Sequence, residues 1–132
     1  MIQRPNAVGL VPCEDIIVAE GTRTMSLIKT FSRFEVAQFP SGPRPFTAIT
    51  ILTDGLGEVA LSLTIARLDT FEEIYSRTTR ITFTNQLSEI RMFRRVASCS
   101  FPVPGRYQIS LLVGQEEIAQ CVLTVLRRRK KP

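Results

Sequence analysis

Hydrophobic and polar residues alternate in short runs along most of this chain, which is the pattern of β-strands with one buried face. The last third of the chain gives the clearest example. Apolar residues there occupy every second position, first after a turn at Pro104-Gly105 and again after a turn at residues 114–117: Tyr107, Ile109, Leu111 and Val113, then Cys121, Leu123 and Val125. This spacing predicts a β-hairpin.

Similar runs, separated by turn residues, predict ten strands in all: Ala7–Val11, Asp15–Val18, Met25–Phe31, Phe34–Gln38, Phe46–Thr53, Glu58–Leu68, Arg80–Thr84, Glu89–Ala97, Arg106–Val113 and Ile118–Leu126. Asp54-Gly55 predicts a hairpin turn, and the proline-rich segment 39–45 predicts a loop. The Thr-x-x-Glu pattern at Thr70 and Glu73 fits either a short helix or a loop. The strand spacing favours an all-β fold, a single antiparallel β-sandwich spanning residues 1–126.

The entry to the last hairpin, Pro104-Gly105-Arg106-Tyr107, resembles the tyrosine corner of immunoglobulin-like sandwiches. In that motif a tyrosine at the start of a late strand hydrogen-bonds back to upstream backbone. The resemblance implies an immunoglobulin-like sandwich, although the chain contains no tryptophan and therefore lacks the Cys…Trp…Cys core of antibody domains.

The positive charge of the chain belongs to its C-terminus. The sequence holds 17 Lys and Arg against 12 Asp and Glu, a net charge of +5. The whole excess lies in a segment that we expect to be a disordered tail, residues 127–132, with five consecutive cations: Arg127, Arg128, Arg129, Lys130 and Lys131. The high pI therefore does not indicate a basic DNA-binding face. The tail is either a solvated end or a weak contact for anions.

A second basic cluster is formed by Arg91, Arg94 and Arg95. In a strand Arg91 and Arg95 share one face and Arg94 takes the other. Such arginines either protect a strand edge from pairing with other chains or, together with the tail, contact an anionic ligand or partner.

Enzymatic chemistry has little support in the sequence. The absence of histidine removes Ser-His-Asp and Cys-His mechanisms and the commonest metal ligand. The three cysteines, Cys13, Cys99 and Cys121, are scattered and odd in number, as in reducing compartments, and are interpreted as buried small side chains. We predict no catalytic, metal or cofactor site. An enzyme would need one pocket to hold two members of a specific set: Cys13, Asp15, Asp54, Asp69, Glu72 and Glu73.

Five short motifs occur in a recognisable order: Cys13-Glu14-Asp15, Ser26-Leu27-Ile28 leading to Phe31, Phe39-Pro40, Phe46 leading to Asp54-Gly55, and the closing Phe101, Gly105 and Tyr107. In this order the chain resembles a family of short bacterial proteins of uncharacterised function, over about Leu10 to Val125. The resemblance implies a compact β-sandwich in a bacterial cytoplasm, and it brings no catalytic residues.

We therefore expect a non-enzymatic binding or interaction module, cytoplasmic because the chain has neither a membrane-spanning run nor an apolar leader. Its partner is expected to be another protein, bound by loops at one end or by a sheet edge, and a homodimer through such an edge stays open. The alternatives are a weak anion or nucleic-acid binder that uses the tail and the Arg91–Arg95 strand, and a small carboxylate- or thiol-dependent enzyme.

Overall fold

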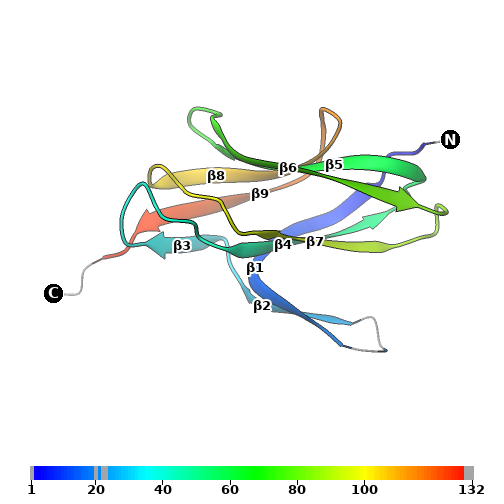
Figure 1. Cartoon of the computed structure of the whole chain (residues 1–132), viewed down its shortest axis with the longest axis horizontal. Coiled ribbons are helices and arrows are strands. Elements are labelled where there is room, and N and C mark those ends of the chain that lie inside the picture. The colour runs from blue at the N-terminus through cyan, green and yellow to red at the C-terminus, as the bar shows by residue number, and fades with distance from the viewer. Residues whose placement is uncertain (1, 20, 22–23, 130–132) are drawn as a thin grey trace.

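A computed structural model describes residues 2–19, 21 and 24–129, and these residues form two facing β-sheets (Figure 1). The described residues contain nine strands and no helix: β1 (Asn6–Val18), β2 (Met25–Thr30), β3 (Arg33–Val36), β4 (Phe46–Thr53), β5 (Gly57–Arg67), β6 (Glu73–Phe83), β7 (Ile90–Val96), β8 (Gly105–Val113) and β9 (Glu116–Arg127). The predicted all-β class is confirmed.

The two sheets differ in size. The smaller, which we call sheet I, has the order β2-β1-β4-β7, and the larger, sheet II, has the order β3-β9-β8-β5-β6. All pairs are antiparallel except β3 and β9, which run parallel. The expectation of a purely antiparallel sandwich is therefore wrong for this pair, because β3 pairs with a strand from the opposite end of the chain rather than with a hairpin neighbour.

The core fills the space between the sheets. Its largest fully buried side chains come from the strands and from the loop before β8: Phe46, Leu52, Leu61, Ile65, Phe83, Phe101, Tyr107, Ile109, Leu111 and Leu123. Phe101 packs edge-on against both Phe34 and Tyr107, with ring centroids 5.2 and 4.9 Å away. The Tyr107 hydroxyl donates a hydrogen bond to the carbonyl oxygen of Val103, at 2.6 Å. This bond satisfies the one polar atom of a side chain that is otherwise buried among apolar groups.

Several predicted boundaries shift in the structure. The first two predicted strands form one strand, β1, which a bulge at Gly9 bends between Val8 and Val11. Strand β6 begins at Glu73, well before the predicted start at Arg80. The segment 68–72 forms a turn rather than a helix.

The C-terminal end of the sandwich includes part of the expected tail. Strand β9 ends at Arg127, and the backbone N–H of Arg128 donates to the carbonyl oxygen of Val36 at 2.7 Å. The last predicted strand thus extends one residue past Leu126 and stays attached to β3 beyond its end.

One hairpin leaves the body of the sandwich. The second half of β1 and all of β2 project away from sheet I on the side opposite sheet II (Figure 1). Register pairs Ile16 with Leu27 and Val18 with Met25 along this projecting hairpin. Residues of the hairpin thereby come to line a common space with residues of β4 and β7.

Candidate functional site

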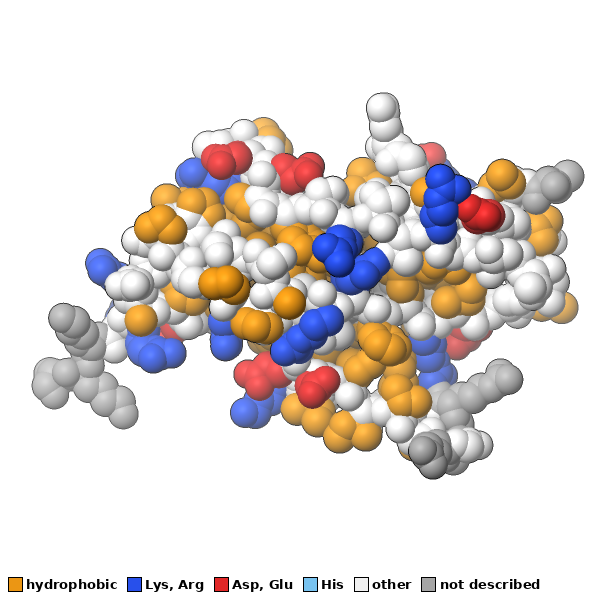
Figure 2. Space-filling view, viewed as in Figure 1, with side chains coloured by type: hydrophobic (Ala, Val, Ile, Leu, Met, Phe, Trp, Pro, Cys, Tyr) orange, Lys and Arg blue, Asp and Glu red, His pale blue; other side chains and the backbone are white. Residues whose placement is uncertain are grey.

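Exposed apolar side chains gather on one of the two sheets. Within the described residues, every large apolar side chain that is both exposed and part of a strand belongs to sheet I: Val8, Ile17, Val18, Leu27 and Phe93. Figure 2 shows apolar side chains along the projecting hairpin, beneath the body of the sandwich. A concentration of exposed apolar side chains on one sheet is typical of a protein-contact region.

A groove lies between the projecting hairpin and the outer face of β4 and β7. We call it the hairpin groove; its volume is about 350 Å³, and its apolar lining comes from three strands: Val8 and Val11 of β1, Met25 and Leu27 of β2, and Ile49 and Ile51 of β4. Among the residues that the structure describes, Arg91 of β7 is the one charged residue that lines it. The groove therefore combines an apolar floor with the Arg91 guanidinium at its side.

The groove continues along β7 into a wider hollow of about 800 Å³. Met25 and Arg91 line both spaces, and Phe93, Leu87 and Val18 extend the apolar surface. Arg91 Nε lies 3.5 Å from Glu89 Oε1, an exposed carboxylate. Because that ion pair is long and solvated, the Arg91 guanidinium can exchange it for a carboxylate of a bound partner.

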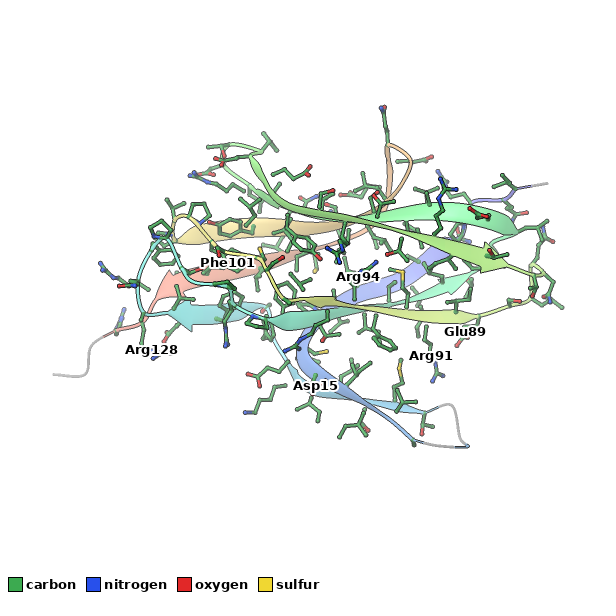
Figure 3. All side chains as sticks on the ribbon, in the orientation of Figure 1. Asp15, Glu89, Arg91, Arg94, Phe101 and Arg128 are labelled. Carbon is green, nitrogen blue, oxygen red and sulfur yellow. The ribbon has the colours of Figure 1, made fainter. Side chains whose placement is uncertain are left out.

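The three arginines of β7 do not form one anion-binding patch. Arg91 faces the groove, whereas Arg94 shares a register position with core residue Ala48 and so faces the interior side of this edge strand (Figure 3). Arg95 is engaged elsewhere: its Nη1 donates to the carbonyl oxygen of Glu14 at 2.7 Å and to Thr47 Oγ1 at 3.1 Å. Arg95 thus links β7 to β1 across β4.

The tail arginines lie apart from β7. Figure 3 shows Arg128 well separated from Arg91 and Arg94 along the long axis of the molecule. Arg127, Arg128 and Arg129 line one hollow at the C-terminal end of the sandwich. Lys130 and Lys131 lie outside the described residues. The prediction combined the tail with the Arg91–Arg95 strand. Among the described arginines, however, the two groups lie on separate surfaces.

A family model described as a family of unknown function (DUF6941) matches residues 10–126. The chain belongs to this family. The resemblance to a family of uncharacterised function is thereby confirmed, and the matched region runs from β1 to β9. No curated protein matches the sequence significantly.

Two of the candidate enzyme residues of this DUF6941 chain, Cys13 and Asp15, lie two positions apart on β1. Cys13 is buried, and burial, with the nearby Asp15 carboxylate as a smaller cause, raises the pKa of its thiol. Asp15 Oδ1 accepts the backbone N–H of Ile16 at 2.8 Å, inside the strand rather than at a turn. The chemistry of this pair favours the protonated thiol, which is a poor nucleophile.

Two of the other candidate carboxylates, Asp54 and Asp69, lie at turns, whereas Glu73 begins β6. Asp54 follows β4, where it accepts hydrogen bonds from Asn6 and Thr53, both at 3.1 Å. Asp69 follows β5, where Arg67 Nε and Nη2 donate to it at 3.1 and 2.9 Å. This pairing lowers the pKa of the Asp69 carboxyl. A hollow of about 390 Å³ beside Tyr107 contains Asp69 but none of the other five candidate residues.

Metal ligands do not cluster in the part of the chain that the structure describes: no three Cys, Asp or Glu residues there could hold an ion together. Nor do its described residues include a helix that is long and apolar enough to span a lipid bilayer.

The hairpin groove was not predicted from the sequence, although one signal pointed to it. The run from Phe46 to Leu52 is apolar or small on both faces, which is typical of a strand that is covered on both sides. In the structure Ile49 lies on the outer face and is only 6% exposed, because β1 and β2 curve beside it. The curvature depends on the bulge in β1, which a strand pattern does not reveal.

Proposed function

We propose that this chain is a non-enzymatic protein-interaction module of a bacterial cytoplasm, and that it binds an apolar segment carrying a carboxylate in the hairpin groove. The observation that carries the proposal is the distribution of exposed apolar side chains, which among strand residues of the described chain are confined to sheet I. Monomeric domains rarely expose contiguous apolar patches larger than a few hundred Å², and larger patches mark interaction sites.

The chemistry of the partner is inferred from the lining. An apolar side chain fits against Val11, Ile49 and Ile51, where its burial contributes about 1.5–3 kcal/mol. Arg91, at the side of the groove, favours a partner with a carboxylate, since a guanidinium binds a carboxylate through two parallel hydrogen bonds.

An immunoglobulin-like classification belongs to the same proposal. If β4 to β9 correspond in order to strands B, C, C′, E, F and G, sheet I contains the B–E pair and sheet II has the order G-F-C-C′. The Tyr107–Val103 hydrogen bond, near the start of the strand that corresponds to F, supports this correspondence. Domains of this kind commonly act by binding through their faces and loops.

A non-enzymatic role is supported by the state of the candidate nucleophiles. The pKa of each cysteine thiol is raised, chiefly by burial, and Asp69 is held in an ion pair with Arg67. Neither arrangement supplies the poised acid, base or thiolate that catalysis requires near neutral pH.

The proposal can be tested by selecting binders from a displayed library of random peptides on the wild-type chain. Leu27→Asp and Arg91→Glu alter the groove. Ile17→Asp is the matched control, because Ile17 lies on the same hairpin, is exposed and does not line the groove. We expect peptides that combine apolar residues with Asp or Glu, and we expect at least about tenfold weaker binding to both groove variants, a loss of about 1.4 kcal/mol.

Two results would contradict the proposal. One is a selection that yields no peptide bound better by the wild type than by Leu27→Asp. The other is a concentration-dependent dimer, seen by analytical ultracentrifugation, that Leu27→Asp abolishes and Ile17→Asp preserves; the occupant of the groove is then a second copy of the chain.

A further inference from the structure

A group of four arginines occupies the C-terminal end of the sandwich. We call Arg44, Arg127, Arg128 and Arg129 the terminal arginine cluster. The parallel pairing of β3 with β9 places Arg127 opposite Val36, and the next backbone N–H, of Arg128, donates to the Val36 carbonyl oxygen. The backbone that carries Arg127 and Arg128 is therefore fixed to the sheet.

Arg44 joins this group from the loop before β4. Its backbone N–H donates to the carbonyl oxygen of Cys99 at 3.1 Å, and its guanidinium lies 5.1 Å from the centroid of the Phe34 ring. The cation–π contact holds the side chain over β3 at a favourable distance. A residue far away in sequence thus adds a positioned cation to the three at the end of β9.

The cluster borders two adjoining hollows. One, of about 480 Å³, is lined by Ala37 and the three consecutive arginines. Arg44 lines the other hollow, of about 320 Å³. Ala37 and Arg128 line both hollows. Ala37 and Arg128 therefore connect the two spaces into one concave basic surface.

The charge of this surface is not balanced. Some arginines elsewhere have carboxylate partners, such as Asp69 for Arg67 and Glu58 for Arg80. Among the described residues none of the four clustered arginines has a carboxylate oxygen within 4.0 Å, although Glu35 lines the smaller hollow. The sequence continues with two further cations, Lys130 and Lys131.

We propose that the terminal arginine cluster binds the phosphate backbone of single-stranded nucleic acid without base specificity. Planar guanidinium groups match phosphate oxygens in two-point hydrogen bonds and also stack on bases. The volumes of the two hollows, about 320 and 480 Å³, are within the range of small-ligand sites.

The surroundings of the cluster favour nucleic acid over a membrane. Stable attachment to a bilayer requires an apolar anchor beside the cations. The exposed large apolar side chains of the described residues lie in other segments: Ile2, Val8, Ile17, Val18, Leu27, Phe71, Leu87 and Phe93. None comes from the elements that carry the cluster.

The test is fluorescence anisotropy with a labelled oligothymidylate, titrated between roughly 50 and 200 mM salt. For single strands the slope of log K against log salt is about −0.7 for each neutralised phosphate. We expect the double change Arg127→Ala and Arg129→Ala to make the slope about 1.4 less steep, and Arg44→Ala about 0.7 less steep. Alanine keeps the backbone bonds of β9, which circular dichroism can verify.

Arg77→Ala is the matched control, because Arg77 is exposed on β6, away from the cluster, and has no carboxylate within 4.0 Å among the described residues. It should leave the slope unchanged. The proposal fails if the oligonucleotide does not bind at the lower salt concentration, or if the cluster variants keep the wild-type slope. It also fails if phosphatidylserine vesicles or polyglutamate bind as tightly as the oligonucleotide.

Discussion

The three cysteines show how burial decides the chemistry of a side chain. Cys13 and Cys99 are fully buried and Cys121 is half-buried. Removal from water raises the pKa of the Cys99 thiol to about 12 and that of Cys121 to about 11, from an ordinary value of 9.0. The interpretation as small buried side chains is thus confirmed for Cys13 and Cys99, and none of the three is a thiolate at neutral pH.

These raised pKa values predict a loss of stability in alkali. The folded chain retains thiol protons that the unfolded chain releases above about pH 9, so the contribution is complete below that pH. The free energy of unfolding should then fall as pH rises towards the folded-state values. We expect the melting temperature to fall less between about pH 8 and pH 10 in Cys99→Ala than in the wild type.

The variant and the wild type are compared by how much the melting temperature changes with pH. The melting temperature itself is not compared, because the cavity in Cys99→Ala lowers it at every pH. Labelling with a thiol reagent at about pH 8 checks whether the cysteine thiols are buried in the folded chain. Native wild-type protein should react slowly, and all three cysteines should react in denaturant. Rapid native labelling of Cys99 would contradict the burial that underlies the prediction.

The position and the partner of a single side chain are also difficult to predict from the sequence. Asp15 was predicted to begin a strand, but it lies well inside β1. Arg95 was grouped with Arg91 by strand alternation, yet it binds the backbone of Glu14, a residue 81 positions away. Alternation predicts which face of a strand a side chain occupies, whereas its partner depends on which strands become neighbours.

At the scale of strands, the sequence predicted best those strands whose two faces differ clearly in polarity. The predicted range Arg106–Val113 overlaps β8 almost completely, because polar and apolar positions alternate from Arg106 to Leu111. The first half of β6, Glu73 to Thr79, was missed because it is rich in polar residues. It forms a strand by pairing with β5 along its whole length, a tertiary contribution that local pattern does not contain.

Free strand edges carry arginines on the interior side. Strands β6 and β7 are the last strands of their sheets. Arg77 of β6 pairs with buried Leu63, and Arg94 of β7 pairs with buried Ala48, so each arginine occupies an inward-facing position at an edge. A charge at such a position hinders the docking of another strand, since pairing would bury it. This geometry supports the edge-protection interpretation for Arg94.

Removing these charges should promote self-association. In sedimentation equilibrium, we expect the double change Arg77→Val and Arg94→Val to raise the weight-average mass above that of the wild type, and to raise it further as the concentration increases. The mass of one chain is 14.9 kDa. Arg80→Val is the control, because Arg80 lies on the same strand but on the opposite face, where it pairs with Glu58. Association of the control to the same extent would show that lost charge, rather than edge exposure, is responsible.

At the scale of the whole molecule, two features could not be predicted from the sequence. One is the parallel pairing of β3 with β9, which joins residues 91 positions apart, such as Arg33 and Thr124. The other is the projecting hairpin, whose direction depends on the bulge between Val8 and Val11. The hairpin groove depends on the second feature, and the terminal arginine cluster depends on the first. Both candidate surfaces therefore follow from long-range geometry.

Because these surfaces lie on different parts of the sandwich, their functions should be separable. Leu27 lines the groove between β2 and β4, whereas Arg127 and Arg129 line a hollow at the end of β9. Substitutions at distant sites without shared partners add within about 0.5 kcal/mol. We therefore expect Leu27→Asp to weaken peptide binding alone, and the Arg127→Ala and Arg129→Ala pair to weaken oligonucleotide binding alone.

The combined variant completes a double-mutant cycle for each ligand. Its affinity for the selected peptide should equal that of Leu27→Asp, and its affinity for the oligonucleotide should equal that of the arginine pair, each within about 0.5 kcal/mol. A larger coupling energy, measured with folding checked by melting temperature, would mean that one ligand contacts both surfaces. It would also mean that the sandwich presents a single extended site from the hairpin to the end of β9, since coupling between distant residues requires a shared partner.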